Sequence, residues 1–218
     1  MSLELEEETL KKMCNLHFPE YVLKMRRYAK ENNVPIIQDE GLSFLISMIR
    51  IKHPQNILEI GTAIGYSGAM MALNSNAFIT TLERDPVMHE ESVKNIEALG
   101  LKSKVRLIYK DALEALSDVN DRKYDLIFID AAKAQYTNFF NLYSPLLSDD
   151  GIIITDNMLF HGVKIEDAKS RSLRGLIRKL NNYTDFLLNN PLYDTTIFNL
   201  GDGMALTSKR HLDLFMKH

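Results

Sequence analysis

Two short apolar segments of this sequence end in side chains that suit a hard metal ion. Asp130 follows "YDLIFI", and the pair Asp156-Asn157 follows "GIIIT". Carboxylate and amide oxygens are donors that Mg²⁺, Mn²⁺ and Ca²⁺ prefer and zinc does not. Lys133 follows Asp130 by three positions, and a cation nearby would disfavour its charged form, which makes its amine a candidate general base. The alternative is a solvated lysine early in a helix.

A second group of residues has the pattern of a loop that binds a small molecule. Residues 61–68 are GTAIGYSG, and the absent side chains of Gly61 and Gly65 let a ligand approach the backbone. The spacing departs from G-x-G-x-x-G, and Glu59 before the loop would repel phosphate. Glu83 lies 24 residues after Glu59, where an acid commonly binds a ribose hydroxyl pair. An adenosine without phosphates fits both observations; a plain tight turn is the alternative.

These residues can meet only if the segments before them form one parallel sheet. From Asn56 onward, short apolar runs alternate with longer amphipathic segments, which predicts βαβ units. Ligands of such a sheet bind outside the carboxyl ends of its strands. The run "KVRLIY" brings Lys110 and Asp111 to the same edge, although Asp111 also suits a helix cap. We expect parallel strands at 56–60, 78–82, 104–109, 124–129 and 151–155.

The C-terminal part predicts an antiparallel addition to this sheet. "TTIFNL" and "MALTSK" flank Gly201-Asp202-Gly203 in the form of a hairpin. We therefore predict an α/β fold, a Rossmann-like, doubly wound, seven-stranded mixed sheet. Residues 1–52 have a helical pattern, and no repeat or linker marks a boundary. A single domain over residues 1–218 follows, with a helical extension (1–52) and an α/β core (53–218).

Composition narrows the function classes. The chain has 218 residues, 45% of them hydrophobic, and a formal net charge of -3, so a nucleic-acid role would need a localised basic site. One cysteine, Cys14, excludes an internal disulfide, and the acidic start "MSLELEEE" is unlike a secretory signal. No apolar run approaches the roughly 20 residues of a membrane helix. We expect a cytoplasmic protein that does not span a membrane.

Five segments together resemble a known enzyme family. In this order and spacing, "ILEIGTAIGYSG", "TLERDP", "KDALEAL", "FIDAAKAQY" and "IIITDNMLFHG" are similar to the metal-dependent class I S-adenosylmethionine O-methyltransferases of the catechol and caffeoyl-CoA type. The resemblance runs from about Val34 to the C-terminus. "NVPII", "NFFNLYSPLL" and "LGDGMALTSK" further resemble the bacterial branch that methylates wobble 5-hydroxyuridine in tRNA. Plant caffeoyl-CoA enzymes are less similar over residues 158–180, which puts a coenzyme-A thioester substrate in doubt.

The resemblance implies roles for individual residues. The metal ligands of the family fall on Asp130, Asp156 and Asn157, and its proposed base falls on Lys133. Mg²⁺ is the expected ion, with Mn²⁺ and Ca²⁺ as alternatives. The candidate S-adenosylmethionine contacts are Ile37, Glu59, Gly61, Gly65, Ser67, Glu83, Asp111, Ala112 and Asp130.

The segment after Asp156-Asn157 predicts an amphipathic helix with a basic face. At about 100° per residue, Arg171, Arg174 and Arg178 fall within about 60° of one another, opposite an apolar stripe. The helix follows the predicted metal site closely, so these arginines would flank the active-site mouth and bind phosphates of an anticodon loop. The alternative is an ordinary solvated helix face.

Three classes of function remain after this reasoning. The leading hypothesis is methyl transfer to the 5-hydroxyl of wobble 5-hydroxyuridine in tRNA, giving 5-methoxyuridine, by a homodimer. The second is O-methylation of a small catechol-like diol. A non-catalytic adenosylmethionine-binding protein is disfavoured, because a pure binder needs neither metal ligands nor a base. The helices before residue 52 either form a dimer interface or close over the acceptor.

Overall fold

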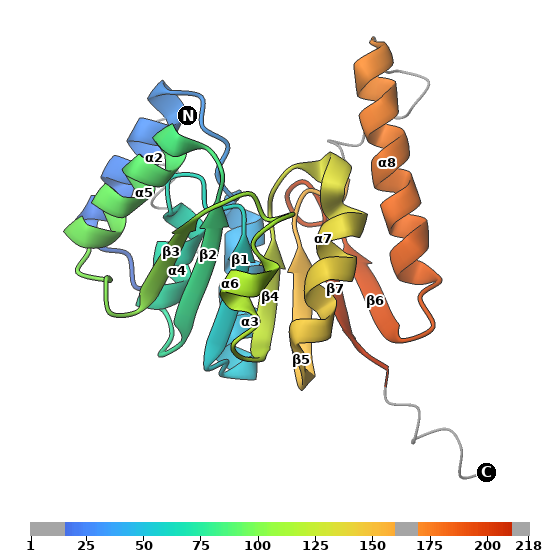
Figure 1. Ribbon diagram of the computed structural model, residues 1–218. Helices are drawn as coiled ribbons and strands as arrows, with labels where there is room; N and C mark the ends of the chain where they lie inside the picture. The colour runs from blue at the N-terminus through green and yellow to red at the C-terminus, as the bar shows by residue number, and fades with distance from the viewer. Residues whose placement is uncertain (1–15, 160–169, 211–218) are drawn as a thin grey trace.

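Seven strands form one mixed sheet in residues 16–159 and 170–210, the part of the chain that the computed structural model describes (Figure 1). They are β1 (Asn56–Ile60), β2 (Phe78–Glu83), β3 (Val105–Tyr109), β4 (Tyr124–Ile129), β5 (Leu147–Thr155), β6 (Tyr193–Phe198) and β7 (Met204–Lys209). Their order is β3-β2-β1-β4-β5-β7-β6. Strands β1 to β5 are parallel, and β7 is antiparallel to both β5 and β6. The predicted fold class is therefore confirmed.

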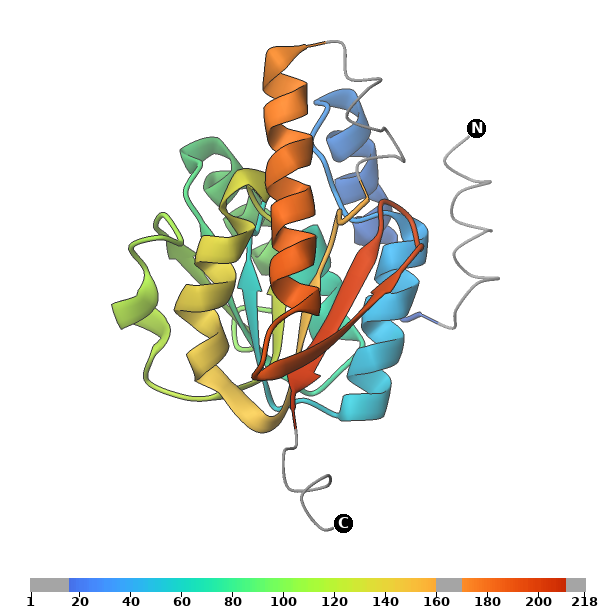
Figure 2. The same ribbon diagram turned by 90° about the vertical axis from the view of Figure 1, so that its right-hand side faces the viewer.

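Helices cover both faces of the sheet. The α-helices are α2 (Glu20–Glu31), α3 (Asp39–Lys52), α4 (Tyr66–Leu73), α5 (Pro86–Ala98), α6 (Leu116–Val119), α7 (Tyr136–Tyr143) and α8 (Arg171–Leu188), and the 3₁₀ turns are η1 (Lys133–Gln135) and η2 (Ser144–Leu146). Figure 2 shows α7 and α8 on one side of the strands and α3 on the other.

Alternate side chains of the central strands enter two separate hydrophobic clusters, because successive strand residues point to opposite faces. Ile57, Leu126 and Phe128 pack with apolar residues of α2 to α5. Leu58 and Ile127 pack with apolar residues of α6 to α8. Both faces of the central strands are buried, which explains why these strands are almost continuously apolar in the sequence.

The local signals of the sequence correspond to observed boundaries with small shifts. Asp85 caps α5 by accepting hydrogen bonds from the N–H groups of Val87 and Met88, at 2.9 and 3.0 Å, as its place before Pro86 predicts. Strand β6 begins and ends two residues earlier than the predicted 195–200, because residues 200–203 form a turn in which the N–H of Gly203 donates to the Leu200 carbonyl.

Parts of the sequence interpretation lie outside the described residues. Cys14 belongs to residues 1–15, and residues 160–169 between β5 and α8 are also outside the described ranges. Within the described ranges, no helix combines the length and hydropathy that a membrane crossing requires.

Candidate active site

The carboxyl ends of the five parallel strands surround a cavity of about 540 Å³. Its walls include Gly61 after β1, Glu83 at the end of β2, Asp111 after β3, Asp130 after β4 and Asp156 after β5. These residues are far apart in the sequence and meet because parallel strands end at one edge. The other predicted residues on the walls are Ile37, Ser67, Ala112, Lys133 and Asn157.

Gly61 allows the loop after β1 to touch the end of β4. Its φ is +102°, and a Cβ atom built there would lie 2.0 Å from the carbonyl oxygen of Asp130. No residue with a side chain fits this approach, so glycine is required for packing as well as for conformation. Gly65 (φ +79°) instead begins α4, faces Ser92 of α5, and is not part of the cavity wall.

The structure places Glu59 beneath the glycine loop, outside the cavity wall. Its side chain is fully buried and points to the face covered by α4, where a Cβ on Gly68 would lie 2.9 Å from Glu59 Oε2. The hydroxyls of Ser67 and Thr81 donate to its two oxygens. Burial raises the pKa of Glu59 to about 7. Glu59 was predicted to contact the cofactor directly. From its position beneath the glycine loop, it instead orients the loop through Ser67.

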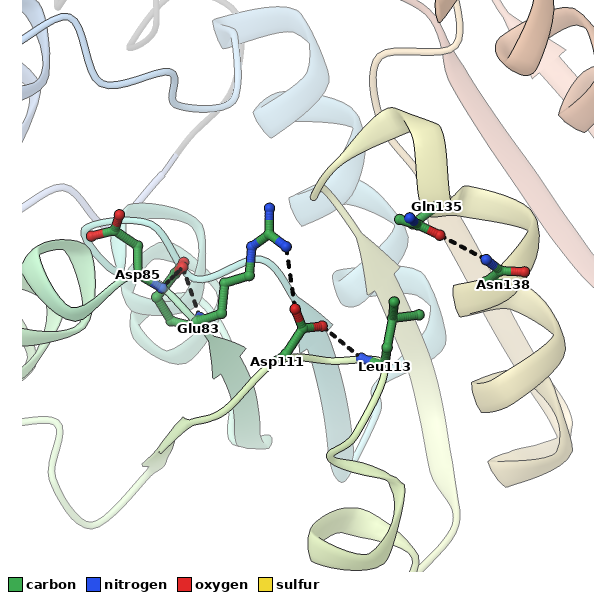
Figure 3. A network of polar contacts seen from close by, with 7 residues as sticks. Glu83, Asp85, Asp111, Leu113, Gln135 and Asn138 are labelled. Carbon is green, nitrogen blue, oxygen red and sulfur yellow. Dashed lines mark hydrogen bonds and ion pairs between the residues drawn. The ribbon is translucent and has the colours of Figure 1, made fainter.

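Glu83 is held rigidly at the end of β2. Its carboxylate accepts hydrogen bonds from the backbone N–H groups of Ala63 (2.7 Å), Arg84 (2.9 Å) and Asp85 (2.8 Å), and Figure 3 shows the contact with Asp85. Oε1 accepts the bonds from Arg84 and Asp85 and Oε2 the bond from Ala63, so the remaining acceptor capacity of the carboxylate, about four lone-pair sites in all, lies on Oε2. The geometry suits a fixed acceptor for a ribose hydroxyl at Oε2.

Asp111 lies on the cavity wall as predicted, but it does not cap a helix, because the next helix, α6, begins only after Ala115. It accepts a hydrogen bond from the N–H of Leu113 (2.9 Å) and is paired with Arg84 (3.2 Å), as Figure 3 shows. The Leu113 N–H and the Arg84 guanidinium hold the pKa of Asp111 below its ordinary value. It thus stabilises a turn and also presents a charged carboxylate to the cavity.

A hydrogen-bonded chain joins the ends of β4 and β5. Lys133 Nζ donates to Asn157 Oδ1 at 3.0 Å, and Asn157 Nδ2 donates to Asp130 Oδ1 at 3.0 Å. Asp156 Oδ1 accepts from the N–H of Asn157 at 2.7 Å. Asn157 has a φ of +62°, a left-handed conformation that asparagine tolerates better than most residues. All four predicted catalytic and metal-binding side chains are therefore brought together.

The two carboxylates of this hydrogen-bonded chain have raised pKa values, because burial and nearby negative charges disfavour their ionised forms. Burial, followed by the charge of Glu59, raises the pKa of Asp130. Burial and the charges of Asp130 and Asp202 raise the pKa of Asp156. In residues 16–159 and 170–210, no three His, Cys, Asp or Glu side chains are grouped to hold a metal, so the donor set is two carboxylates and one amide. Its hard oxygens and excess negative charge fit a divalent cation such as Mg²⁺.

Several cavity residues were not found by sequence reasoning. Asp202 enters the wall from the hairpin turn, which is bonded to the end of β5 through Leu159 N–H and the Asp202 carbonyl at 2.6 Å. An acid between two glycines indicates only a turn, so no local signal was available. Ile37 was found through family resemblance alone. Also on the wall are Gln38, Tyr66, Arg84, Leu113, Gln135 and Phe139.

The predicted basic helix is present but lies outside the cavity wall. Arg171, Arg174 and Arg178 are exposed on α8, whereas Ile177 and Leu180 are buried. Helix α8 packs beside η1, and Figure 1 shows its N-terminal half projecting past the edge of the sheet where the parallel strands end. The predicted orientation of the apolar and basic faces is thus confirmed.

The fold and the cavity agree with comparisons to known proteins. The chain belongs to the O-methyltransferase family, whose model matches residues 13–210. It is 32% identical over 173 residues to the catechol O-methyltransferase of Niastella koreensis, covering 75% of this chain and 77% of that protein.

Two solved structures extend this similarity. A Staphylococcus aureus protein, provisionally described as a caffeoyl-CoA O-methyltransferase, has a TM-score of 0.87 and 39% identity, covering 94% of this chain and all of that one. A Podospora anserina methyltransferase with bound S-adenosylhomocysteine has a TM-score of 0.82 and 25% identity, covering 95% of this chain and 94% of that one. The protein is accordingly an S-adenosylmethionine-dependent O-methyltransferase of the caffeoyl-CoA and catechol type.

Proposed function

We propose that this enzyme is metal-dependent and methylates the 5-hydroxyl of wobble 5-hydroxyuridine in tRNA. The observation that carries the RNA part is the exposed row of Arg171, Arg174 and Arg178 on the half of α8 that projects past the active edge. Guanidinium groups there would meet the phosphates of an anticodon loop whose wobble base enters the cavity.

The metal part of the proposal is supported by the donor set. Asp130, Asp156 and Asn157 would hold the ion through oxygen atoms. When bound, a divalent cation would lower the pKa of the acceptor hydroxyl. The 5-hydroxyl and the adjacent O4 of 5-hydroxyuridine offer two neighbouring oxygens, as the two hydroxyls of a catechol do.

The residues of the chain would perform the remaining steps. Lys133 Nζ, 3.0 Å from Asn157 Oδ1, accepts the hydroxyl proton. The acceptor oxygen bonds to the sulfonium methyl carbon while the carbon–sulfur bond breaks, and its electron pair stays on sulfur in S-adenosylhomocysteine. The glycine loop and Glu83 hold the donor in place, and positioning of this kind contributes roughly 7 to 11 kcal/mol in favourable cases.

A second candidate substrate is a small catechol-like diol. The 32% identity to a catechol O-methyltransferase favours it, and the same metal ligands and base would serve. The two candidates differ in their need for α8, because a free diol has no phosphates for the arginines to bind.

The test is methyl transfer from labelled S-adenosylmethionine with Mg²⁺, comparing tRNA that carries wobble 5-hydroxyuridine with a free catechol. We expect label in 5-methoxyuridine after nucleoside digestion. Replacing Arg171, Arg174 and Arg178 together by Gln should lower the log–log salt dependence of tRNA binding by about 2, at about 0.7 per lost single-strand phosphate contact.

A matched variant removes three positive charges elsewhere, by Lys94→Gln, Lys102→Gln and Arg122→Gln. Lys94 and Lys102 are each 63% exposed, and we expect tRNA methylation by this variant to remain at the wild-type level. Methylation of catechol but not tRNA would overturn the RNA proposal in favour of the second candidate. Full activity in the presence of a chelator would overturn the metal proposal.

A further inference from the structure

Helix α2 makes a buried ionic contact with two elements of the cofactor site. Arg26 is 9% exposed, and its Nη1 donates to Asp39 Oδ1 at 2.7 Å and to the Tyr66 hydroxyl at 3.0 Å. Its Nη2 donates to Asp39 Oδ2 at 3.3 Å. A single guanidinium therefore connects α2, the first residue of α3 and the first residue of α4.

Both partners of Arg26 adjoin the cavity wall. Tyr66 ends the glycine loop and lies on the wall itself, and Asp39 directly follows Ile37 and Gln38, which form the wall on the side of α3. Tyr66 as a whole is only 1% exposed. Because the guanidinium has a planar, forked shape, it sets the relative orientation of the groups that it binds as well as their distance.

A second polar connection runs from α2 to the same loop. The Tyr21 hydroxyl donates to Asn95 Oδ1 at 3.2 Å, and Asn95 Nδ2 donates to the Ile64 carbonyl at 2.9 Å. Figure 1 shows α2 beside α5, the helix that contains Asn95. Two independent contacts of one helix thus end on neighbouring positions of the glycine loop.

The loop needs such support because its backbone is strained. Ala63 has a φ of +45°, a left-handed conformation that costs a residue with a Cβ about 1–2 kcal/mol. Strained conformations of this kind persist only where the surrounding structure holds them. Glu59 and Glu83 hold the loop from the sheet, and α2 holds it from the outside.

We infer that Arg26 is a positioning residue for S-adenosylmethionine binding, which keeps Tyr66 and the segment before Asp39 at the spacing that the cofactor requires. Tyr21 supports the same loop through Asn95. The α2 helix is therefore part of the cofactor site although none of its residues is on the cavity wall. This inference concerns the methyl donor and is independent of the acceptor.

The test measures S-adenosylhomocysteine binding to the full-length protein by calorimetry. Arg26→Met should weaken binding about tenfold, the scale of a lost hydrogen bond to a charged group. The matched control is Arg27→Met, which removes the same charge from an exposed neighbour on α2 and should stay within about twofold of wild type. The KM for S-adenosylmethionine should rise by a similar factor, with kcat at saturation changed by less than about threefold.

A double-mutant cycle tests the route through Tyr66. Tyr66→Phe removes one buried hydroxyl and should weaken binding about threefold, and adding it to Arg26→Met should cost little more. Arg26→Lys, which keeps the charge and loses the fork, should restore part of the affinity. If Arg26→Met does not fold, Tyr66→Phe and Tyr21→Phe test the same connections with smaller changes.

Three results would overturn the inference. The first is equal affinity of the Arg26→Met and Arg27→Met variants. The second is a fall in kcat without any loss of S-adenosylhomocysteine affinity. The third is weaker binding that disappears after correction for the folded fraction, which would make Arg26 a purely structural residue.

Discussion

The two halves of the cavity differ in how their charged groups are satisfied. In the cofactor half, formed by the ends of β1 to β3, Glu83 and Asp111 on the cavity wall accept hydrogen bonds from backbone N–H groups, and Glu59 beneath the loop accepts from two hydroxyls. In the acceptor half, formed by the ends of β4 and β5, burial raises the pKa values of Asp130 and Asp156, with a contribution from the charge of Glu59 at Asp130 and from the charges of Asp130 and Asp202 at Asp156. Protein donors stabilise the wall carboxylates of the cofactor half. The buried carboxylates of the acceptor half would instead be stabilised by a divalent cation.

This difference corresponds to two tasks, cofactor binding in one half of the cavity and the methyl-transfer reaction in the other. A cofactor that is exchanged at every turnover benefits from a preformed site, because no ordering cost is then incurred on binding. A reacting centre instead needs groups with displaced pKa values, and these are stable only where neighbours impose them. The following experiments should affect the two halves to different extents.

The largest effect is expected at Gly61, where the halves touch. Gly61→Ala would place a Cβ atom 2.0 Å from the Asp130 carbonyl at a φ of +102°, so we expect a loss of more than about 4 kcal/mol in the free energy of unfolding. Gly100→Ala is the control, because it has a φ of +68° and no atom within 4 Å. It should cost about 1–2 kcal/mol from strain alone. Urea denaturation compares them, and similar losses in both variants would show that the contact between the halves yields easily.

Asp156→Ala should disable the acceptor half alone. We expect kcat/KM to fall by at least about a hundredfold, the scale of one electrostatic group in an active site, with S-adenosylhomocysteine affinity within about twofold of wild type. Chelation of divalent cations should have the same two effects on the wild-type enzyme. Asp149→Ala is the control, since Asp149 is in β5, the strand that Asp156 follows, and its side chain is 98% exposed. An equal loss of activity and cofactor affinity in Asp156→Ala would mean that the halves are not separable.

Glu59→Gln should change the pH dependence of stability. The pKa of Glu59 is raised to about 7 from 4.5, so the folded protein binds this proton more tightly than the unfolded chain. Its contribution is complete below about pH 4.5 and is lost as the pH rises through about 7. The contribution is at most about 3 kcal/mol, at 1.36 kcal/mol for each pKa unit.

The Gln side chain stays uncharged at every pH. The free energy of unfolding of Glu59→Gln should therefore increase relative to that of wild type as the pH rises from about 4.5 to about 7.5. Asp130 and Asp156 are present in both proteins, but the charge of Glu59 contributes to the raised pKa of Asp130, so the difference between the curves reports Glu59 together with its coupling to Asp130. Urea unfolding at several pH values measures the difference. Parallel curves for the two proteins would contradict the raised pKa of this buried carboxyl.

The sequence located the chemistry well where a strand ended in a polar residue. Glu83, Asp130 and Asp156 were found because each follows an apolar run, and all three line one cavity. Glu59 was predicted to contact the cofactor from its place before the glycine loop, but the face of the sheet to which its side chain points depends on α4 packing over β1, which one strand cannot reveal. Arg26 gave no signal, because its partners belong to other helices and an arginine in an amphipathic helix indicates a solvated face.

Hydrophobic periodicity, turn residues and strand-end acids were sufficient to predict the class of fold and the edge of the sheet at which ligands bind, because these features depend on neighbours close in the chain. The assignment of side chains to the cavity wall, to the space beneath the loop or to the contacts of α2 required the folded protein. Such contacts join segments distant in sequence, and burial among them sets the pKa values of Glu59, Asp130 and Asp156. Patterns between neighbouring residues do not show which side chains become buried. The raised pKa values therefore could not be predicted before the sheet and its helices were seen together.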